Sequence, residues 1–141
     1  MNAYVSAILQ GAVLTVGVSV AALLVSVVLG LLGAGAKLSG RPVWVGLATA
    51  YTTVIRGIPD LVLMLLIFYG GTIGLNNALE WMGSEATVDI NPFVAGVLTL
   101  GFIYGAYMTE TFRGAMLSIP KGQAEAAWAF GMGRTQTFIR I

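Results

Sequence analysis

The charged side chains of this chain are few, and they limit the chemistry that it could do. Seven Lys and Arg and six Asp and Glu are spread over 141 residues, with no His and no Cys. The absence of His removes the commonest general base, and the absence of Cys removes thiolate metal sites and disulfides. Gly70, Gly71 and Gly74 lie in an apolar run, so they do not form a phosphate-binding loop before a soluble helix. We therefore expect this chain to perform no catalysis and to bind no metal or cofactor.

Two charged groups have spacings that allow a polar site. Arg56 and Asp60 flank the breaker Pro59, and Asp60 suits the positive amino end of a helix that starts there. Glu110 and Arg113 are three residues apart and can pair on one helical face.

Hydroxyl side chains surround the second group: Tyr104, Tyr107, Thr109 and Thr111. They could face a solute pathway, although tyrosines near a helix end are more often interfacial anchors. We assign none of them as a ligand.

The composition places these residues in an all-α integral membrane protein. The chain is 57% hydrophobic and 9% charged, whereas soluble domains carry about 25% charged residues. Residues 1–36, 61–79 and 90–109 carry no charge, and about 20 apolar residues cross a bilayer as a helix. We predict three spans, at about 12–36, 61–79 and 92–109. The apolar stretch 43–55 is too short to cross and is predicted to be an interfacial or packed helix.

The charges between the spans predict the orientation. All seven Lys and Arg fall in segments 37–60 and 110–141, whereas segment 80–91 carries only Glu80, Glu85 and Asp89. Because basic loops remain cytoplasmic, we expect the N-terminus and the acidic segment outside and the C-terminal segment inside. The three acids could attract a cationic solute or a basic partner.

In this setting the two charged groups have a structural and a functional interpretation. Arg56 could reach lipid phosphates, or its box could bend at an inner gate. The Glu110–Arg113 pair is a functional candidate as an ionisable pair at a membrane edge. Alternatively, the pair is structural and holds the third span to the polar tail.

The polar tail after the third span predicts a water-facing helix–turn–helix. Ser118 is the expected N-cap, with Pro120 in the first turn. Gly131 and Gly133 are expected to stop this helix, and Thr135 to cap a second one. A helix with an alanine face can dock in a groove of a partner or lie on the membrane surface as an amphipathic helix.

The tail resembles the EAA loop of ABC-importer permeases, in which Glu-Ala-Ala is followed by Gly six residues after the Glu and by Ile ten residues later. The matching residues are Glu125, Ala126, Ala127, Gly131 and Ile141. The resemblance implies that these residues couple the chain to an ATPase.

Two further boxes of the polar-amino-acid branch occur in order. They are Arg-Gly-x-Pro at Arg56, Gly57 and Pro59, and Glu-x-x-Arg-Gly at Glu110, Arg113 and Gly114. Pro120, Gly122 and Gln123 match the Pro-x-Gly-Gln lead-in to the EAA loop. The resemblance extends from about residue 8 to the end of the chain. It is greatest to the permeases of histidine/lysine/arginine/ornithine importers, with arginine and opine permeases still open.

The resemblance implies a MetI-like fold, normally of five transmembrane helices, of which residues 1–141 form a partial permease domain. The cytoplasmic coupling helix–turn–helix would occupy about 118–141. The family continues with a Leu-Pro pair and two more helices, so we expect the chain to be truncated at its C-terminal end.

The resemblance also implies a function: alternating-access transport of polar, foremost basic, amino acids across the bacterial inner membrane. The implied partners are a second permease, identical or sister, a periplasmic amino-acid-binding protein, and an ABC ATPase that binds the ATP and Mg²⁺. No nucleic acid is implied. Two alternatives are a small three-span pore of the holin kind and a non-transporting membrane anchor.

Overall fold

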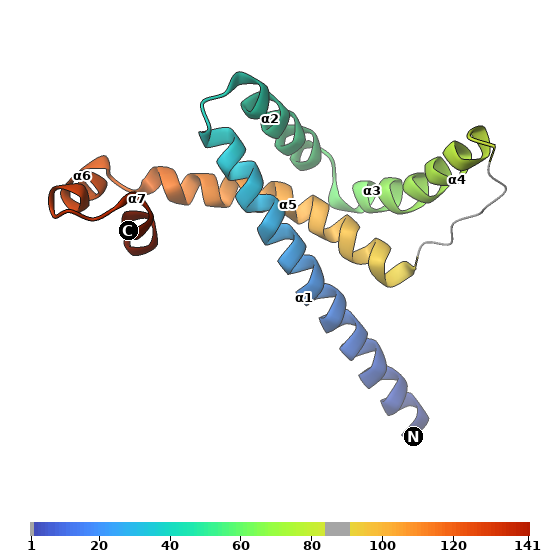
Figure 1. The fold of residues 1–141 in the computed structure, drawn as a ribbon. Helices are drawn as coiled ribbons and strands as arrows, with labels where there is room; N and C mark the ends of the chain where they lie inside the picture. Colours follow the sequence, from blue (N-terminus) through green and yellow to red (C-terminus); the bar gives the residue numbers. More distant parts are fainter. Residues whose placement is uncertain (1, 84–90) are drawn as a thin grey trace.

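A computed structural model of the chain describes residues 2–83 and 91–141, and every element within them is helical (Figure 1). The elements are α1 (Asn2–Leu38), α2 (Pro42–Gly57), α3 (Asp60–Leu65), the π-helical turn η1 (Leu66–Gly70), α4 (Gly71–Trp81), α5 (Pro92–Ser118), α6 (Lys121–Ala129) and α7 (Arg134–Arg140). The predicted all-α class is confirmed for this part of the chain.

Three helical segments are long and apolar enough to cross a membrane. They are Tyr4–Leu38, Asp60–Trp81 and Pro92–Ser118. The middle one is a continuous run of α3, η1 and α4, and it contains the π-helical turn. Helix α2 is shorter, with 16 residues, and packs through the buried Ala48, Thr52 and Ile55. Of the two predicted possibilities, an interfacial helix or a packed helix, α2 is therefore the packed helix.

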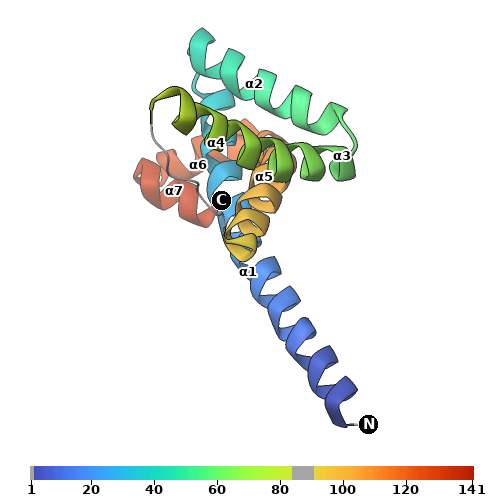
Figure 2. The same ribbon diagram turned by 90° about the vertical axis from the view of Figure 1, so that its right-hand side faces the viewer.

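The main packing contact is the crossing of α1 and α5 (Figures 1 and 2). Glycines on both helices make this close approach possible. A Cβ atom added to Gly33 would lie 2.2 Å from Thr109 Oγ1, and one added to Gly101 would lie 2.5 Å from Val25 Cγ1. Small residues at such crossings bring the two backbones together, as in other membrane helix pairs.

A small apolar core forms where α2, α3 and α5 meet. It contains the buried side chains of Ile55, Leu63, Ile103 and Ala106. The amino-terminal part of α1 extends away from this core (Figure 2), and its apolar side chains are exposed. This surface is suited to lipid or to other apolar helices.

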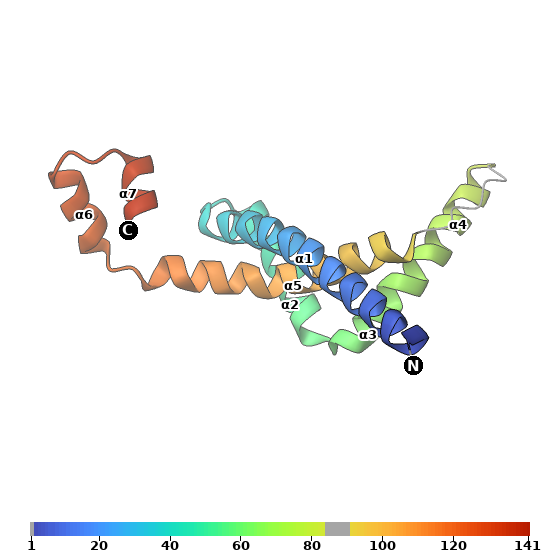
Figure 3. The ribbon, with the colours of Figure 1, turned by 90° about the horizontal axis from the view of Figure 1, so that it is seen from below.

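Helices α6 and α7 project from the far end of α5, away from the other helices (Figures 1 and 3). Ser118 is the last residue of α5, and Pro120 is the N-cap of α6. The predicted N-cap role of Ser118 is therefore wrong. Its hydroxyl donates to the carbonyl of Ala115 at 2.7 Å. Helix α5 does not continue past Ser118, because the C-cap residue Ile119 precedes a proline and has an extended backbone.

The predicted cap of the second tail helix is also displaced. Gly133 is the N-cap of α7, so Thr135 lies inside the helix. An extended glycine can begin a helix without a side-chain cap, which makes the hydroxyl of Thr135 unnecessary there.

Candidate functional site

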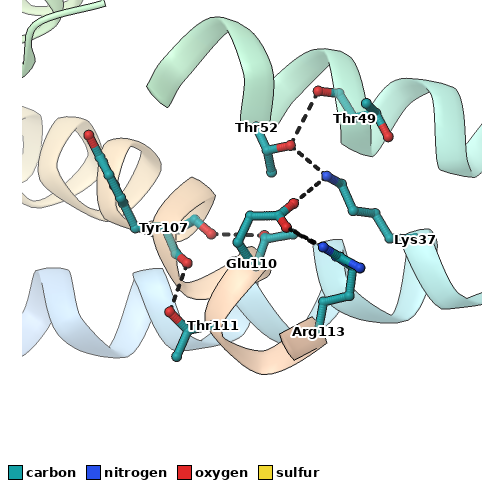
Figure 4. Close-up of polar contacts among 9 residues, drawn as sticks. Lys37, Thr49, Thr52, Tyr107, Glu110, Thr111 and Arg113 are labelled. Atoms are coloured by element: carbon teal, nitrogen blue, oxygen red, sulfur yellow. Dashed lines mark hydrogen bonds and ion pairs between the residues drawn. The ribbon is translucent and has the colours of Figure 1, made fainter. Parts of the chain in front are cut away.

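A charged cluster joins the end of α1 to α2 and α5 (Figure 4). The Lys37 ammonium at the end of α1 donates to Glu110 Oε1 of α5. It also donates to Thr52 Oγ1 of α2 at 2.7 Å. On the other side of the carboxylate, Arg113 Nε lies 3.0 Å from Glu110 Oε2 and Nη2 lies 2.9 Å from the same oxygen. The predicted Glu110–Arg113 pair is present, and Lys37 extends it.

This cluster is partly removed from water, which decides how its charges must be arranged. The side chains of Lys37 and Glu110 are 12% and 18% exposed, and that of Arg113 is 36% exposed. Charges taken out of water are costly unless they are paired and hydrogen-bonded. Glu110 meets this requirement with one cation on each carboxylate oxygen, so it has little capacity left for another cation.

A second polar group lies at the break between α2 and α3. The hydroxyl of Tyr107 on α5 donates to Asp60 Oδ1 at 3.1 Å. The guanidinium carbon of Arg56 lies 5.6 Å from the centre of the Tyr107 ring, within the range of a cation–π contact. Pro59 is the N-cap of α3, and Asp60 occupies the first turn of that helix, as the sequence predicted. The contacts with Tyr107 were not predicted.

The tail forms a third group, in which backbone geometry fixes the end of α6. Gly131 has a φ of +81°, where a side chain is strained. The amide of Met132 donates to the carbonyl of Ala127 at 3.0 Å, and that of Gly131 donates to Trp128 at 2.9 Å. These two bonds form a Schellman motif, which turns the chain back toward α7. The predicted helix stop at Gly131 is therefore present in the structure.

The turn presents some of the predicted coupling residues to the outside. Glu125 and Ala126 are exposed, whereas Ala127 is buried. No ion pair of Glu125 occurs among residues 2–83 and 91–141. The end of α5 and the two tail helices enclose a groove of about 580 Å³. Trp128, Phe138 and Ile141 line this groove.

The remaining residues of the three boxes make fewer contacts. Gly57 ends α2, Gly114 lies inside α5 and Gly122 lies in the first turn of α6. A Cβ atom added to any of these glycines would meet nothing within 4 Å. The structure therefore brings the first two boxes onto the packed helices, while the EAA residues stand apart on the projecting tail.

The acidic segment is described only in part. Glu80 lies in α4 and is exposed, whereas Glu85 and Asp89 lie outside the described residues. Within the described ranges, no group of three acidic, His or Cys side chains is placed to hold a metal ion.

Together, the apolar helices, the charged cluster between them and the projecting helix pair define a helical membrane protein with a separate polar tail. Residues 26–141 match the family described as the binding-protein-dependent transport system inner membrane component. The chain belongs to this family.

Curated relatives agree with this assignment. The chain is 56% identical over 134 residues to the histidine/lysine/arginine/ornithine transport system permease protein HisQ of Escherichia coli (strain K12), covering 95% of the chain and 58% of the relative. It is 38% identical over 133 residues to the octopine transport system permease protein OccQ of Rhizobium radiobacter, covering 94% and 56%. The arginine ABC transporter permease protein ArtQ of Haemophilus influenzae is 33% identical over 141 residues, covering 98% and 59%.

A solved structure confirms the permease fold. The chain matches the crystal structure of an amino acid ABC transporter with histidines, with a TM-score of 0.72 and 31% identity. The match covers 97% of this chain and 58% of that one. The family resemblance predicted from the three boxes is thus confirmed. The chain spans 58% of the length of HisQ.

Proposed function

We propose that this chain serves as a permease subunit of an ATP-driven importer of polar, foremost basic, amino acids. The observation that most strongly supports this proposal is the family match over residues 26–141, together with 56% identity to a histidine/lysine/arginine/ornithine transport system permease protein. No comparable family match favours the three-span pore or the non-transporting membrane anchor.

The proposed setting is the bacterial inner membrane, with the basic segments 37–60 and 110–141 in the cytoplasm. A second permease, identical or sister, would cover apolar surface that this chain leaves exposed. A periplasmic binding protein would deliver the amino acid from the side of segment 80–91, whose three acids could attract a cationic solute. The chain itself would bind no cofactor.

The proposed coupling element is the tail. An ABC ATPase would bind ATP and Mg²⁺ and dock on Glu125, Ala126, Ala127 and Gly131, with Ile141 at the edge of the same surface. Glu125 is exposed and forms no ion pair with the described residues, so its carboxylate could pair with a cation of that partner. Small alanine side chains permit close approach. Closure of two ATPases would then move the tail, and the paired permeases would alternate between inward and outward access.

Co-purification with the ATPase subunit of the same transport system tests this proposal. The wild-type chain should retain the ATPase, and Gly131→Arg should lose it together with ATP-dependent uptake of labelled arginine and histidine. Gly133→Arg is the matched control, because Gly133 lies in the same turn with an ordinary φ of −70°. Retention of the ATPase by Gly131→Arg, or uptake without ATP, would contradict the proposal.

A further inference from the structure

A groove lies between α1 and α2, where α2 turns back from the end of α1 (Figure 1). Gly40 allows this turn with a φ of +69°, a backbone conformation that glycine adopts readily. The α1–α2 groove has a volume of about 650 Å³, and α5 contributes Phe102 to its lining. It is separate from the groove at the tail, with which it shares no lining residue.

The long walls of this groove are apolar. Leu32 of α1 is 66% exposed, and Leu47 of α2 is 60% exposed. Trp44, Leu47 and Tyr51 follow one another at steps of three and four residues, so they line the same face of α2. From Arg41 to Tyr51 the helix rises by about 15 Å, which is roughly half of the ~30 Å hydrocarbon core of a bilayer. The apolar wall therefore has about the depth of one lipid leaflet.

The turn end of the groove is polar and positively charged. Arg41 is exposed and forms no ion pair with the described residues. Ser39 lines the same end, and its hydroxyl accepts a hydrogen bond from the Arg41 amide at 3.3 Å. Trp44 lies in the first turn of α2. Among the described residues, no acidic side chain lines the groove, which thus combines an unpaired cation with a long apolar wall.

This combination fits an anionic phospholipid better than a solute or a protein helix. A guanidinium binds a phosphate through two parallel hydrogen bonds, and basic pockets between membrane helices bind anionic headgroups. Tryptophan favours the headgroup level of a membrane. An apolar helix of a second permease would cover Arg41 without supplying an anion, which is costly. An amino acid would find no carboxylate for its ammonium.

We propose that the α1–α2 groove binds one anionic phospholipid. Arg41 pairs with the lipid phosphate, Trp44 lies beside the headgroup region, and an acyl chain lies along Leu32, Leu47 and Phe102. The lipid contacts three helices at once, so its binding stabilises their packing. This site goes beyond the proposed transport function and does not depend on it.

Quenching of tryptophan fluorescence by brominated lipids tests this site in the full chain. Trp81→Phe and Trp128→Phe leave Trp44 as the only tryptophan, and bromine on an acyl chain quenches an indole that it contacts. Mixed micelles of detergent carry either brominated phosphatidylglycerol, which is anionic, or brominated phosphatidylcholine, which has no net charge. Phosphatidylglycerol should reach half-maximal quenching at about a fivefold lower mole fraction, the preference expected from one arginine at a membrane surface.

Two substitutions in this background separate the cation from the apolar wall. Arg41→Gln should lose the preference for phosphatidylglycerol, whereas Leu47→Gln should weaken quenching by both lipids and keep the preference. Arg140→Gln is the matched control, because Arg140 is also exposed but does not line the groove. In detergent without phospholipid, Arg41→Gln should unfold at the same temperature as the parent chain, so a lost preference does not reflect a damaged fold.

An equal response of the parent chain to the two lipids, or an unchanged preference in Arg41→Gln, would overturn the site. Loss of the preference in Arg140→Gln as well would show that the lipid follows the overall charge of the chain and not this groove. An absence of quenching by either lipid would refute the lipid as occupant and leave a protein surface as the cover of Trp44. None of these measurements uses ATP or a transported solute, so the site and the proposed function fail separately.

Discussion

Lys37 shows at the scale of single residues how a cation is accommodated at the end of a membrane-length helix. Its ammonium contacts the carboxylate of Glu110 and the hydroxyl of Thr52, and Thr52 in turn donates to the carbonyl of Thr49 at 3.2 Å. Lys37, Glu110 and Thr52 thus each have a hydrogen-bond partner in this cluster. The cluster therefore stabilises the meeting point of three helices only as long as all of its members are present.

Replacing Lys37 with Met tests this dependence. The change keeps the length of the side chain but removes one of the two cations that hold Glu110. We expect the free energy of unfolding to fall by about 1–3 kcal/mol, because a partly buried carboxylate loses a charged partner. Thermal unfolding of the wild type and the variant in the same detergent measures this change in the free energy of unfolding.

Arg41→Gln is the control for this loss, because Arg41 is exposed and has no ion pair among the described residues. Combining Lys37→Met with Glu110→Gln should cost less than the sum of the two single changes, because the second change removes the orphaned charge. Strict additivity would show that the ammonium and the carboxylate are not energetically coupled.

The residue-scale predictions from sequence succeeded where partners are close along the chain. Glu110 and Arg113 are one helical turn apart, so their pairing follows from helix geometry. Lys37 lies 73 residues from Glu110, and no local pattern identifies such a partner. The one available signal was that Lys37 is the first charge after 36 uncharged residues. The roles of the EAA residues in docking remain predictions.

At the scale of the elements, the crossing of α1 and α5 depends on which glycines face the partner helix. Gly33 faces Thr109, whereas a Cβ atom at Gly35 would meet nothing within 4 Å. These two glycines belong to one helix and differ chiefly in this contact, which makes them a matched pair.

Gly33→Ala should separate the two helices and lower the free energy of unfolding by about 1–3 kcal/mol, because the added methyl group overlaps Thr109. Gly35→Ala should leave stability nearly unchanged. Thr109→Ala should recover part of the loss in Gly33→Ala, since both atoms closest to the added methyl are removed. Equal unfolding temperatures for the Gly33 and Gly35 variants would show that the crossing is looser than described.

The end of α6 provides a second element-scale prediction. Gly131→Ala places a side chain at positive φ and should cost about 1 kcal/mol locally, or about a fivefold rise in amide exchange at Met132. Gly133→Ala should leave this exchange unchanged, since its φ is ordinary. Hydrogen exchange of the tail measures both variants. Unchanged protection in Gly131→Ala would mean that the Schellman bonds do not hold the turn.

Element boundaries were predictable only where the chain carries a strong breaker. Pro59 starts a new helix, as predicted, and Gly131 ends one. Ser118 and Thr135 were assigned as caps because their side chains are suited to that role. In the structure, the Ser118 hydroxyl donates to the carbonyl of Ala115, and Gly133 takes the N-cap position of α7. Where α6 begins depends on how far α5 continues, and local propensity does not determine this.

At the scale of the whole molecule, the proposed orientation can be tested by chemical labelling. The sequence contains no Cys, so single cysteines report their own side of the membrane. In intact cells a membrane-impermeant maleimide should label Met82→Cys, and it should label Gln136→Cys only after permeabilisation. Both positions are exposed. Labelling of Gln136→Cys in intact cells would place the tail outside, where an ATPase could not reach it.

The unbroken α5 has a mechanical consequence. It runs for 27 residues from Pro92 to Ser118 and packs against α1 partway along its length. A rigid helix held at such a point can tilt about it, so that its two ends move in opposite directions. From Thr109 to Ser118 the rod measures roughly 13 Å, so a pull of about 1 Å on its tail end corresponds to a tilt of about 5°. The opposite end would swing the other way at once. In the orientation proposed above, a small displacement of the tail would therefore move the amino end of α5 in the opposite direction on the other side of the membrane.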